Sequence, residues 1–369
     1  MKKLLSLVLS LALIMAMFTA CGKSDKTEDT SANPTAEPTQ EATQAPTEEP
    51  TQAPADTTAA TAKTGLGVVS SIAKSTNAAA DAEGLGETDS LAVAVLVGQD
   101  GKILDCQIDM GQTKVNFSTE GKITTDLASV VKSKQELGTD YGMKGISGIG
   151  KEWNEQADAF AAYVIGKTVD EVKGIAVNDK GTAGDADLAS SVTIHIGDFI
   201  AATEKAVNNA QDLGALATDK IGLGIITQIT GSKDVAADAD GLAQAYSYYV
   251  VTTSNAEGVI TSSFVDASIG NVNFNAKGEI TTDLAVGPQT KQELKDAYGM
   301  KKASGIGKEW YEQANAFATY VTGKTIDQVK GIAVTEDGHA GDADLASSVT
   351  VHVGPFIQGV DKAFANAAK

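Results

Sequence analysis

The hydrophobic positions of this chain first follow the period of a β-strand and later that of a helix. Residues 91–97 read LAVAVLV, and residues 102–109 alternate between apolar and polar side chains beyond a glycine-containing turn. Residues 113–117 and 122–125 flank a second turn of this kind. Short apolar or alternating runs separated by turn residues predict β-strands joined as hairpins.

A helical period begins at Trp153. The apolar face of the predicted helix comprises Trp153, Ala157, Phe160, Ala161 and Val164. Gly166 ends this helix, and Thr168 with Glu171 three residues later predicts the capped start of a second, short helix. A last helix is expected from Asp198. Strands followed by helices predict an α+β fold, in which an antiparallel sheet is packed by helices on one side.

This pattern occurs twice along the chain. Residues 134–153 and 291–310 are identical at fifteen of twenty positions, and the letters AGDADLASSVT stand at both 183–193 and 340–350. The two copies align without a gap. A repeat of about 150 residues has the size of a domain and is far longer than a solenoid unit.

Two tandem homologous domains are therefore predicted, repeat 1 at residues 64–213 and repeat 2 at residues 221–369. Each repeat has its own strands, helices and apolar faces, and each exceeds the size below which small cores fail. We expect either repeat to fold alone. The best-matched stretches of the two repeats are the first places to look for a functional site.

The N-terminal residues have the features of a lipoprotein signal peptide. Two lysines precede an apolar run, and small residues precede Cys21, which predicts a signal peptide at residues 1–20. The segment resembles a bacterial lipobox, which implies that Cys21 receives a diacylglycerol. Two acyl chains anchor a protein to a membrane without a spanning helix. The alternatives are an ordinary signal peptide cut elsewhere and a short membrane helix.

Residues 21–63 predict a disordered tether. They are rich in Thr, Pro, Ala, Glu and Gln and contain almost no large apolar residue. Such a segment cannot offset the entropy of ordering by burial. Its prolines would stiffen it into an extended spacer between the membrane and the two repeats.

Charge and cysteine content narrow the class of function. The chain has 29 basic and 48 acidic residues, a net charge of −19, which argues against nucleic acid as a partner. Besides Cys21 the chain has one cysteine, Cys106, whose counterpart in repeat 2 is Ser263. One thiol cannot form an internal disulfide, and it cannot carry a chemistry common to both repeats.

Several catalytic and metal-binding motifs are incomplete or missing. Residues 166–168 (GKT) resemble the end of a phosphate loop, but Ala161 stands at its required glycine. Residues 65–67 (GLG) begin a dinucleotide fingerprint whose third glycine is replaced by Ser70. Residues 238–241 (DADG) lack the glutamate that closes a calcium loop. The sequence contains no HExxH, CxxC or GxSxG, so hydrolytic and metal catalysis are not expected.

The order of the remaining features resembles that of the extracytoplasmic FMN-binding domains. The turn at residues 100–103 (DGKI) comes first, the Trp153 helix with its Gly-Lys ending follows, and residues 187–193 (DLASSVT) precede an Ala-rich closing helix at 198–209. Residues 344–350 repeat the DLASSVT motif. Domains of this family occur in the Na⁺-pumping and Rnf-type respiratory complexes and in surface flavin lipoproteins of Gram-positive bacteria.

The family motif is Asp-x-x-Ser/Thr-Gly-Ala-Thr, and its Thr takes FMN through a phosphoester. This chain has Ser191-Val192 and Ser348-Val349 where the family has Gly-Ala. Glycine lets a phosphate approach the backbone more closely than serine does. Residues 192–196 also alternate like a strand, whereas the family motif runs almost directly into a helix, whose N-terminus would offer free N–H groups.

The resemblance implies FMN as the cofactor, bound covalently or non-covalently. Thr193 and Thr350 would anchor the phosphate or accept the covalent link. The supporting residues would be Ser190, Ser191, Ser347 and Ser348, as hydrogen-bond donors to the phosphate, and Asp187 and Asp344, which would orient the loop or a metal used by a flavin transferase. Candidates for stacking on the flavin ring are Tyr141, Trp153, Tyr298 and Trp310, although a Trp on an amphipathic helix is more often part of a core.

The implied function is that of a lipid-anchored, extracytoplasmic flavoprotein of a Gram-positive cell membrane. The flavin would carry the electron chemistry, and the protein would be an electron-transfer protein rather than a stand-alone enzyme. Its partners would be the membrane, a flavin transferase and a membrane electron donor. The alternative is a non-enzymatic surface lipoprotein that binds a ligand or spaces other components. His195 and His352 are interpreted as core or edge histidines, with proton donation as a second interpretation.

Overall fold

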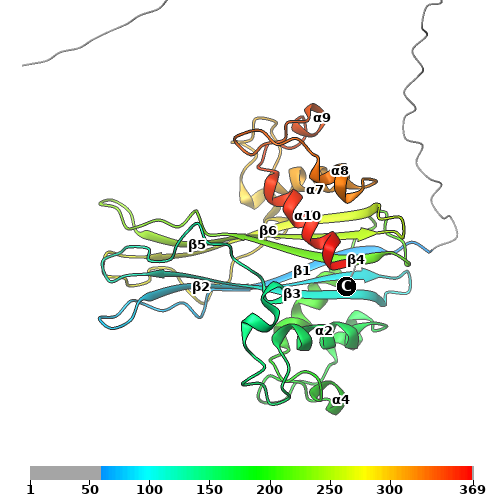
Figure 1. The fold of residues 1–369 in the computed structure, drawn as a ribbon, viewed down its shortest axis with the longest axis horizontal. Helices are drawn as coiled ribbons and strands as arrows, with labels where there is room; N and C mark the ends of the chain where they lie inside the picture. Colours follow the sequence, from blue (N-terminus) through cyan, green and yellow to red (C-terminus); the bar gives the residue numbers. More distant parts are fainter. Residues whose placement is uncertain (1–59, 368–369) are drawn as a thin grey trace, which may run out of the picture. The chain divides into compact units, whose positions relative to one another are not determined.

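Each repeat contains a three-stranded antiparallel sheet, seen in a computed structural model that describes residues 60–367. The strands of repeat 1 are β1 (Lys63–Ser71), β2 (Gly84–Val97) and β3 (Ile103–Phe117). Those of repeat 2 are β4 (Lys220–Gln228), β5 (Gly241–Ser254) and β6 (Ile260–Phe274). The order is β1-β2-β3 in one sheet and β4-β5-β6 in the other, so β2 and β5 are the central strands (Figure 1).

The helices follow the strands in each repeat, which confirms the predicted α+β class. In repeat 1 they are α1 (Lys134–Leu137), the 3-10 turn η1 (Gly138–Tyr141), α2 (Trp153–Val164), α3 (Val169–Lys173), α4 (Ala186–Ala189) and α5 (Gly197–Asn208). In repeat 2 they are α6 (Lys291–Leu294), η2 (Lys295–Tyr298), α7 (Trp310–Val321), α8 (Ile326–Lys330), α9 (Ala343–Ala346) and α10 (Gly354–Ala367).

The predicted helix starts and stops are those of the structure. Helix α2 begins at Trp153, and Thr168 forms a capping box with Glu171 at the start of α3. The predicted strand at residues 192–196 is wrong, because this segment has no strand pairing and leads into α5. The predicted strand at residues 122–125 is wrong as well, because this segment forms only the single bridge from Ile123 to Phe117. The predicted signal peptide, Cys21 and most of the predicted tether lie outside the described residues. Its last residues belong to the fold, since Ala62 is fully buried and Lys63 begins β1.

Strand β1 was not predicted from the sequence, and its glycines allow a helix to pack closely against it. A Cβ atom on Gly67 would lie 2.0 Å from the carbonyl oxygen of Ala202 in α5. In repeat 2, a Cβ atom on Gly224 would lie 2.3 Å from the carbonyl oxygen of Gly359 in α10. The Gly-Leu-Gly segments therefore let a helix cross close to the edge strand, a close approach that only glycine permits.

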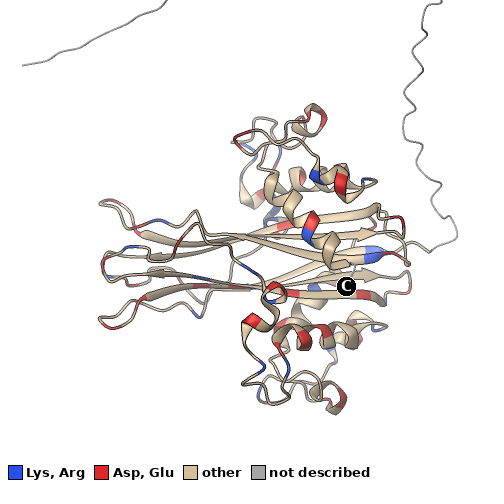
Figure 2. Ribbon diagram, in the orientation of Figure 1, with Lys and Arg blue, Asp and Glu red and all other residues tan. Residues whose placement is uncertain are grey.

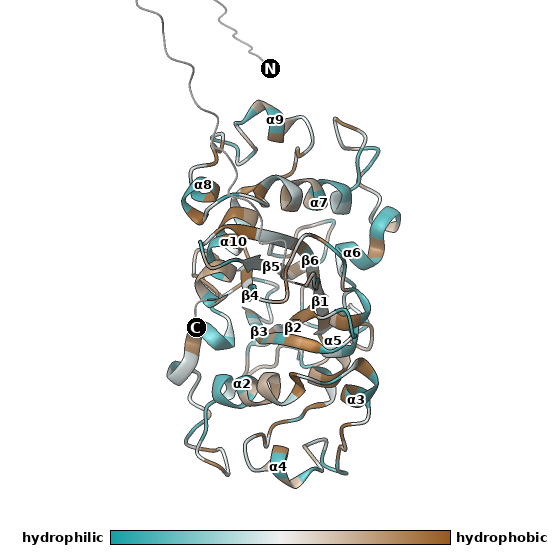
Figure 3. Ribbon diagram, turned by 90° about the vertical axis from the view of Figure 1, so that its right-hand side faces the viewer, coloured by the Kyte–Doolittle hydropathy of each residue, from teal (hydrophilic) through white to brown (hydrophobic). Residues whose placement is uncertain are grey.

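The central strands are buried on both faces. In β2, Leu91, Val93 and Val95 pack against the helices of repeat 1, whereas the alternate residues Ala92 and Ala94 face the sheet of repeat 2. The result is four layers, with helices outside and two sheets inside (Figure 3). Charged residues lie mainly on the helices and loops, and the strands are largely free of them (Figure 2).

The two sheets share a hydrophobic core. Its buried residues are Ala62, Leu66, Val68, Ala92, Ala94, Leu96, Ala215, Ile221, Leu223, Ile225, Tyr249, Val251 and Phe264. A second shared cluster contains Phe117 and Phe274, whose rings stack with centroids 3.9 Å apart. Three ion pairs among the described residues also join the repeats: Lys205 to Glu293 at 2.7 Å, its counterpart Lys362 to Glu136 at 2.6 Å, and Lys122 to Asp234 at 3.2 Å.

Burial outweighs these ion pairs in holding the repeats together. Full burial of one Leu, Ile or Val side chain contributes ~1.5–3 kcal/mol, whereas a partly exposed ion pair contributes under about 1 kcal/mol. Since the inner face of each sheet is covered by the other sheet, a single repeat would expose this core to water. This arrangement argues against the expectation that each repeat folds alone, although residues 64–213 and 221–369 remain the division of the sequence.

We predict that residues 60–213 and residues 214–369, expressed separately, will be unfolded or will self-associate through the exposed inner face. Circular dichroism and light scattering after size exclusion measure both outcomes. Mixing the two fragments should restore a one-to-one complex with a cooperative thermal transition. A monomeric fragment that melts cooperatively by itself would contradict the prediction, and residues 60–369 in one chain provide the control.

Candidate functional site

The DADLASSVT motif forms a short helix and the loop after it. Asp185 caps α4 by accepting hydrogen bonds from the N–H groups of Asp187 and Leu188, at 2.9 and 3.1 Å. Val192, which replaces the alanine of the family motif, is fully buried in the core of repeat 1. Repeat 2 has the same arrangement, with Asp342 as the cap of α9. The motif therefore has a structural role in both repeats, whatever else it does.

A buried glutamine on α2 fixes the position of the candidate threonine. The amide oxygen of Gln156 accepts hydrogen bonds from the N–H and the hydroxyl of Thr193, at 2.8 and 3.2 Å, and from the N–H of Ile194. Gln313 makes the same contacts to Thr350, at 2.7 and 3.2 Å. Thr193 is exposed and Thr350 is half-buried, so both threonines lie near the surface, with their hydroxyl groups bonded to the glutamines.

The candidate serines are occupied within the turn. Ser190 donates to the carbonyl oxygen of Asp187 at 2.7 Å, and Ser191 donates to that of Leu188 at 3.4 Å. Ser347 and Ser348 make the corresponding bonds in repeat 2. Asp187 and Asp344 are both exposed.

These observations bear differently on two ways of holding FMN: non-covalent binding of its phosphate by backbone N–H groups, and a covalent phosphoester on Thr193. The N–H groups of Thr193 and Ile194 already bond to Gln156, and α5 begins four residues later at Gly197. The N–H groups of Thr193 and Ile194 are therefore not available to a phosphate, and the first N–H groups of α5 lie at least four residues beyond Thr193. The hydroxyl of Thr193, an exposed residue, makes the longer bond to Gln156, at 3.2 Å, and as the acceptor of a phosphoester it would give up this bond.

The two threonine loops lie far from each other. Helices α4 and α9, which precede these loops, lie at opposite ends of the molecule in two views (Figures 1 and 3). His195 and His352 follow the threonines and are exposed, so the interpretation as core histidines is wrong, because the segment that carries them is not a strand.

The best-matched segment of the two repeats builds a second candidate site, around a lysine. In repeat 1, the Nζ atom of Lys134 lies 4.5 Å from the centroid of the Tyr141 ring and 5.1 Å from that of Trp153. These are the first, eighth and last residues of the segment 134–153. The structure thus brings together two residues predicted to stack on flavin, but their partner here is a lysine that the sequence analysis did not consider.

Repeat 2 has the more complete aromatic enclosure. The Nζ atom of Lys291 lies 4.4 Å from the ring centroid of Tyr246, 4.3 Å from that of Tyr298 and 4.8 Å from that of Trp310. It also donates a hydrogen bond to the Tyr246 hydroxyl. Lys291 is 2% exposed. We call Lys291 with these three rings the aromatic box.

Repeat 1 has charged groups where repeat 2 has an aromatic ring. Asp89 occupies the strand position that corresponds to Tyr246, and it pairs with Lys74 at 2.5 Å. Glu87 lies 3.8 Å from Lys74 and 3.8 Å from Lys114. The two repeats therefore surround the same lysine with different chemistry.

Burial lowers the pKa of both lysines, because it disfavours the charged amine. The pKa of Lys134 falls to about 8, and the nearby carboxylates of Asp89 and Glu87 oppose the fall. The pKa of Lys291 falls to about 7, opposed by the more distant Asp266.

Two buried aspartates support the helices that carry these lysines. The Oδ1 atom of Asp109 accepts hydrogen bonds from the N–H groups of Gln135 and Met110, at 3.0 and 2.7 Å. Asp266 does the same for Gln292 and Ala267, at 2.9 and 2.7 Å. Burial raises the pKa of Asp109 to about 6 and that of Asp266 to about 7, although these hydrogen bonds act in the opposite direction.

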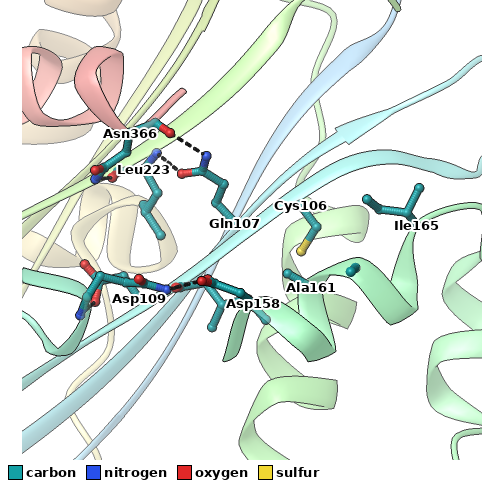
Figure 4. Close-up of a pocket in the computed structure, with 11 residues that line it drawn as sticks. Cys106, Gln107, Asp109, Asp158, Ala161, Ile165, Leu223 and Asn366 are labelled. Carbon is teal, nitrogen blue, oxygen red and sulfur yellow. Dashed lines mark hydrogen bonds between the residues drawn. The ribbon is translucent and has the colours of Figure 1, made fainter. Parts of the chain in front are cut away.

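A cavity of about 350 Å³ lies between the repeats (Figure 4). Its walls include Asp109 and Asp158 of repeat 1 and Leu223 and Asn366 of repeat 2. Gln107 bridges the repeats by donating to the Asn366 carbonyl oxygen at 3.0 Å and accepting from the Leu223 N–H at 3.2 Å.

Cys106 also lines this cavity, but its side chain is buried and burial raises the pKa of the thiol. It is therefore unsuited to act as a nucleophile.

Neither a metal-binding cluster nor a membrane-spanning helix is found in the part of the chain that the structure describes. Residues 60–367 contain no group of three or more His, Cys, Asp or Glu side chains that could hold a metal ion. Within the same residues, no helix has the length and apolar character needed to cross a membrane.

Comparison with known proteins gives one short similarity. No family model matches the chain, and no solved structure matches it. A segment of 42 residues is 50% identical to a protein named chlorophenol reductase from Desulfitobacterium hafniense. The segment covers 11% of this chain and 13% of that protein, so this chain spans a small part of its relative. The resemblance to FMN-binding domains remains a prediction from the motifs.

We predict that Asp266→Asn will stabilise the protein more, or destabilise it less, at pH 8 than at pH 5. The folded protein holds a proton on Asp266 up to a pKa of about 7, whereas an unfolded aspartate loses it near about 3.9. Between these values the folded state binds more protons, so this carboxyl lowers the free energy of unfolding as the pH rises through that window. Asparagine keeps an acceptor for Gln292 and Ala267 but does not titrate.

Thermal unfolding at the two pH values measures the effect. The Asp140→Asn variant, which makes the same substitution at an exposed aspartate, is the control. An equal difference at both pH values for Asp266→Asn would contradict a raised pKa.

Proposed function

We propose that this chain is a lipid-anchored, extracytoplasmic protein that carries FMN as a phosphoester on Thr193 and on Thr350. The observation that supports the proposal is the same in both repeats: a buried glutamine holds a threonine of the DADLASSVT motif at the surface. A threonine near the surface in a fixed loop is accessible to a transferase. The occupied backbone donors favour covalent attachment over loose binding.

Each residue of the loop has a distinct part in this proposal. Gln156 orients Thr193 and would keep its bond to the Thr193 N–H after the hydroxyl is esterified. Asp185 keeps α4 in place through its cap, so that the loop is presented in one conformation. FMN, when bound, supplies the electron chemistry.

The proposed role is electron carriage by two independent sites. Because the loops lie at opposite ends of the molecule, each site would exchange electrons with a partner outside this chain rather than with the other site (Figure 1). A membrane electron donor and a lipid anchor at Cys21 complete the proposal. The chain would then act as a carrier and not as a stand-alone enzyme.

We expect co-expression with a flavin transferase to add the mass of FMN less water once or twice. Thr193→Val and Thr350→Val should each remove one adduct, because valine lacks the hydroxyl, and the double variant should remove both. Intact-mass spectrometry measures the adducts. Thr193→Ser should retain the adduct, and the exposed Thr139→Val is the matched control.

When the apo-protein is titrated with free FMN, we expect no quenching of FMN fluorescence at micromolar concentration. The N–H groups of Thr193 and Ile194, which could bind the phosphate, are occupied by Gln156. Quenching without any adduct would replace covalent attachment by non-covalent binding. The absence of both an adduct and quenching would contradict the proposal.

The anchor has a separate test. We expect Cys21→Ala to release the protein into the medium or to leave its precursor uncleaved in the membrane, because no thiol would then accept the diacylglycerol. Cell fractionation with immunoblotting measures the distribution. Normal processing and membrane retention of this variant would contradict the lipobox.

A second candidate function is small-ligand binding between the repeats. The supporting observation is the cavity of about 350 Å³, which has polar groups from both repeats and lies near the lower end of the size of ligand pockets. Gln107→Phe would place in repeat 1 the residue that repeat 2 has at this position, Phe264, whose own cavity is smaller, at about 280 Å³, and would remove the polar group that bridges the repeats. Loss of ligand-induced thermal stabilisation in this variant, with unchanged FMN attachment, would favour this function.

A further inference from the structure

The aromatic box of repeat 2 opens onto a cavity of about 430 Å³. Lys291 and Tyr298 form part of its wall, together with Ile269 and Asn271 of β6, Leu294 of α6 and residues 286–289. The cavity contains no second basic side chain among these lining residues. Lys291, whose amine lies among the three rings, therefore borders a space that is large enough for a small organic molecule.

The amine of Lys291 has aromatic rings and a hydroxyl as neighbours. It donates to the Tyr246 hydroxyl, and the ion pairs among the described residues do not include it. A lysine without a carboxylate partner in a desolvated site loses its proton readily, and lysines of this kind serve as nucleophiles. Burial lowers the pKa of Lys291 to about 7, so a large fraction of the amine is neutral at physiological pH.

Repeat 1 supplies an internal comparison. Lys134 begins the same KQEL segment, but Asp89 stands at the strand position of Tyr246, and Glu87 and Lys74 complete a network of charges. Carboxylates favour the charged amine, and the pKa of Lys134 is about 8. Both repeats thus have the lysine, but the neighbouring groups that influence the protonation state of its amine differ between them.

We propose that Lys291 is a nucleophilic amine that forms a reversible Schiff base with short aliphatic aldehydes entering this cavity. The proposal is independent of flavin binding. The apolar walls formed by Ile269, Leu294 and Pro288 suit an alkyl chain. Keto acids should bind less well than aldehydes. Their carboxylate needs a cationic partner, and Lys291, the reacting residue, is the one basic residue that lines the cavity.

The reaction balances without an oxidant or reductant. The Nζ lone pair adds to the carbonyl carbon, and a proton moves from nitrogen to the carbonyl oxygen to give a carbinolamine. Loss of one water molecule then leaves the C=N bond. The Tyr246 hydroxyl already contacts Nζ and is placed to relay that proton.

We test the proposal with propanal and sodium cyanoborohydride, which reduces the imine to a stable propylamine, on the mature chain at pH 7. Peptide mapping should show an initial rate of labelling at Lys291 at least about ten-fold above that at the exposed Lys144, because burial favours the neutral, nucleophilic amine at Lys291. Lys134 should react more slowly than Lys291. Pyruvate should label Lys291 less than propanal does.

Tyr246→Asp reproduces in repeat 2 the group that repeat 1 carries at this position. We expect this variant to lose most of the excess labelling at pH 7 and to regain it as the pH rises toward 9. Tyr246→Phe keeps the ring and should slow labelling through loss of the relay. Labelling of Lys291 in the unmodified chain at or below the rate of Lys144 would overturn the proposal, whether or not the variants fold.

Discussion

The structure depends on the burial of the two central strands, β2 and β5, between a layer of helices and the sheet of the other repeat. When helices cover one face of a strand and a second sheet covers the other, neither face is exposed to solvent. Both faces then need apolar side chains. The alternate residues of β2 therefore belong to different cores, with Val93 under the helices and Ala94 against the other sheet. The small alanines let the sheets approach, and the glycines of the edge strands let α5 and α10 approach from outside.

Much of this fold follows from local sequence. The Trp153 helix, the capped helix after Thr168 and the hairpin turns could be predicted because caps, glycines and apolar spacing act within a few residues. The shared core could not be predicted in the same way. The run LAVAVLV nevertheless contained its signal, since an unbroken apolar strand is typical of burial on both faces, whereas alternation is typical of one.

The candidate sites show the same division between local and long-range information. The Thr193 loop was found through its repeated letters, but its support by Gln156 depends on a helix 37 positions earlier in the sequence. Lys134 and Lys291 were overlooked because a lysine counts as a surface residue in a pattern of hydrophobicity. Their conserved spacing from a tyrosine and a tryptophan within the duplicated segment was the available signal, and only the folded chain shows that the three side chains meet.

The covalent linkage of the repeats has a consequence for their chemistry. Two identical subunits packed through their sheets would carry every substitution twice, so an acidic environment for one lysine would impose the same environment on the other. Joining the halves in one polypeptide removes that constraint. Asp89 and Tyr246 can then stand at equivalent positions of a nearly symmetric scaffold. One chain thereby holds two versions of a single inherited site, free to specialise separately while sharing the stability of one interior.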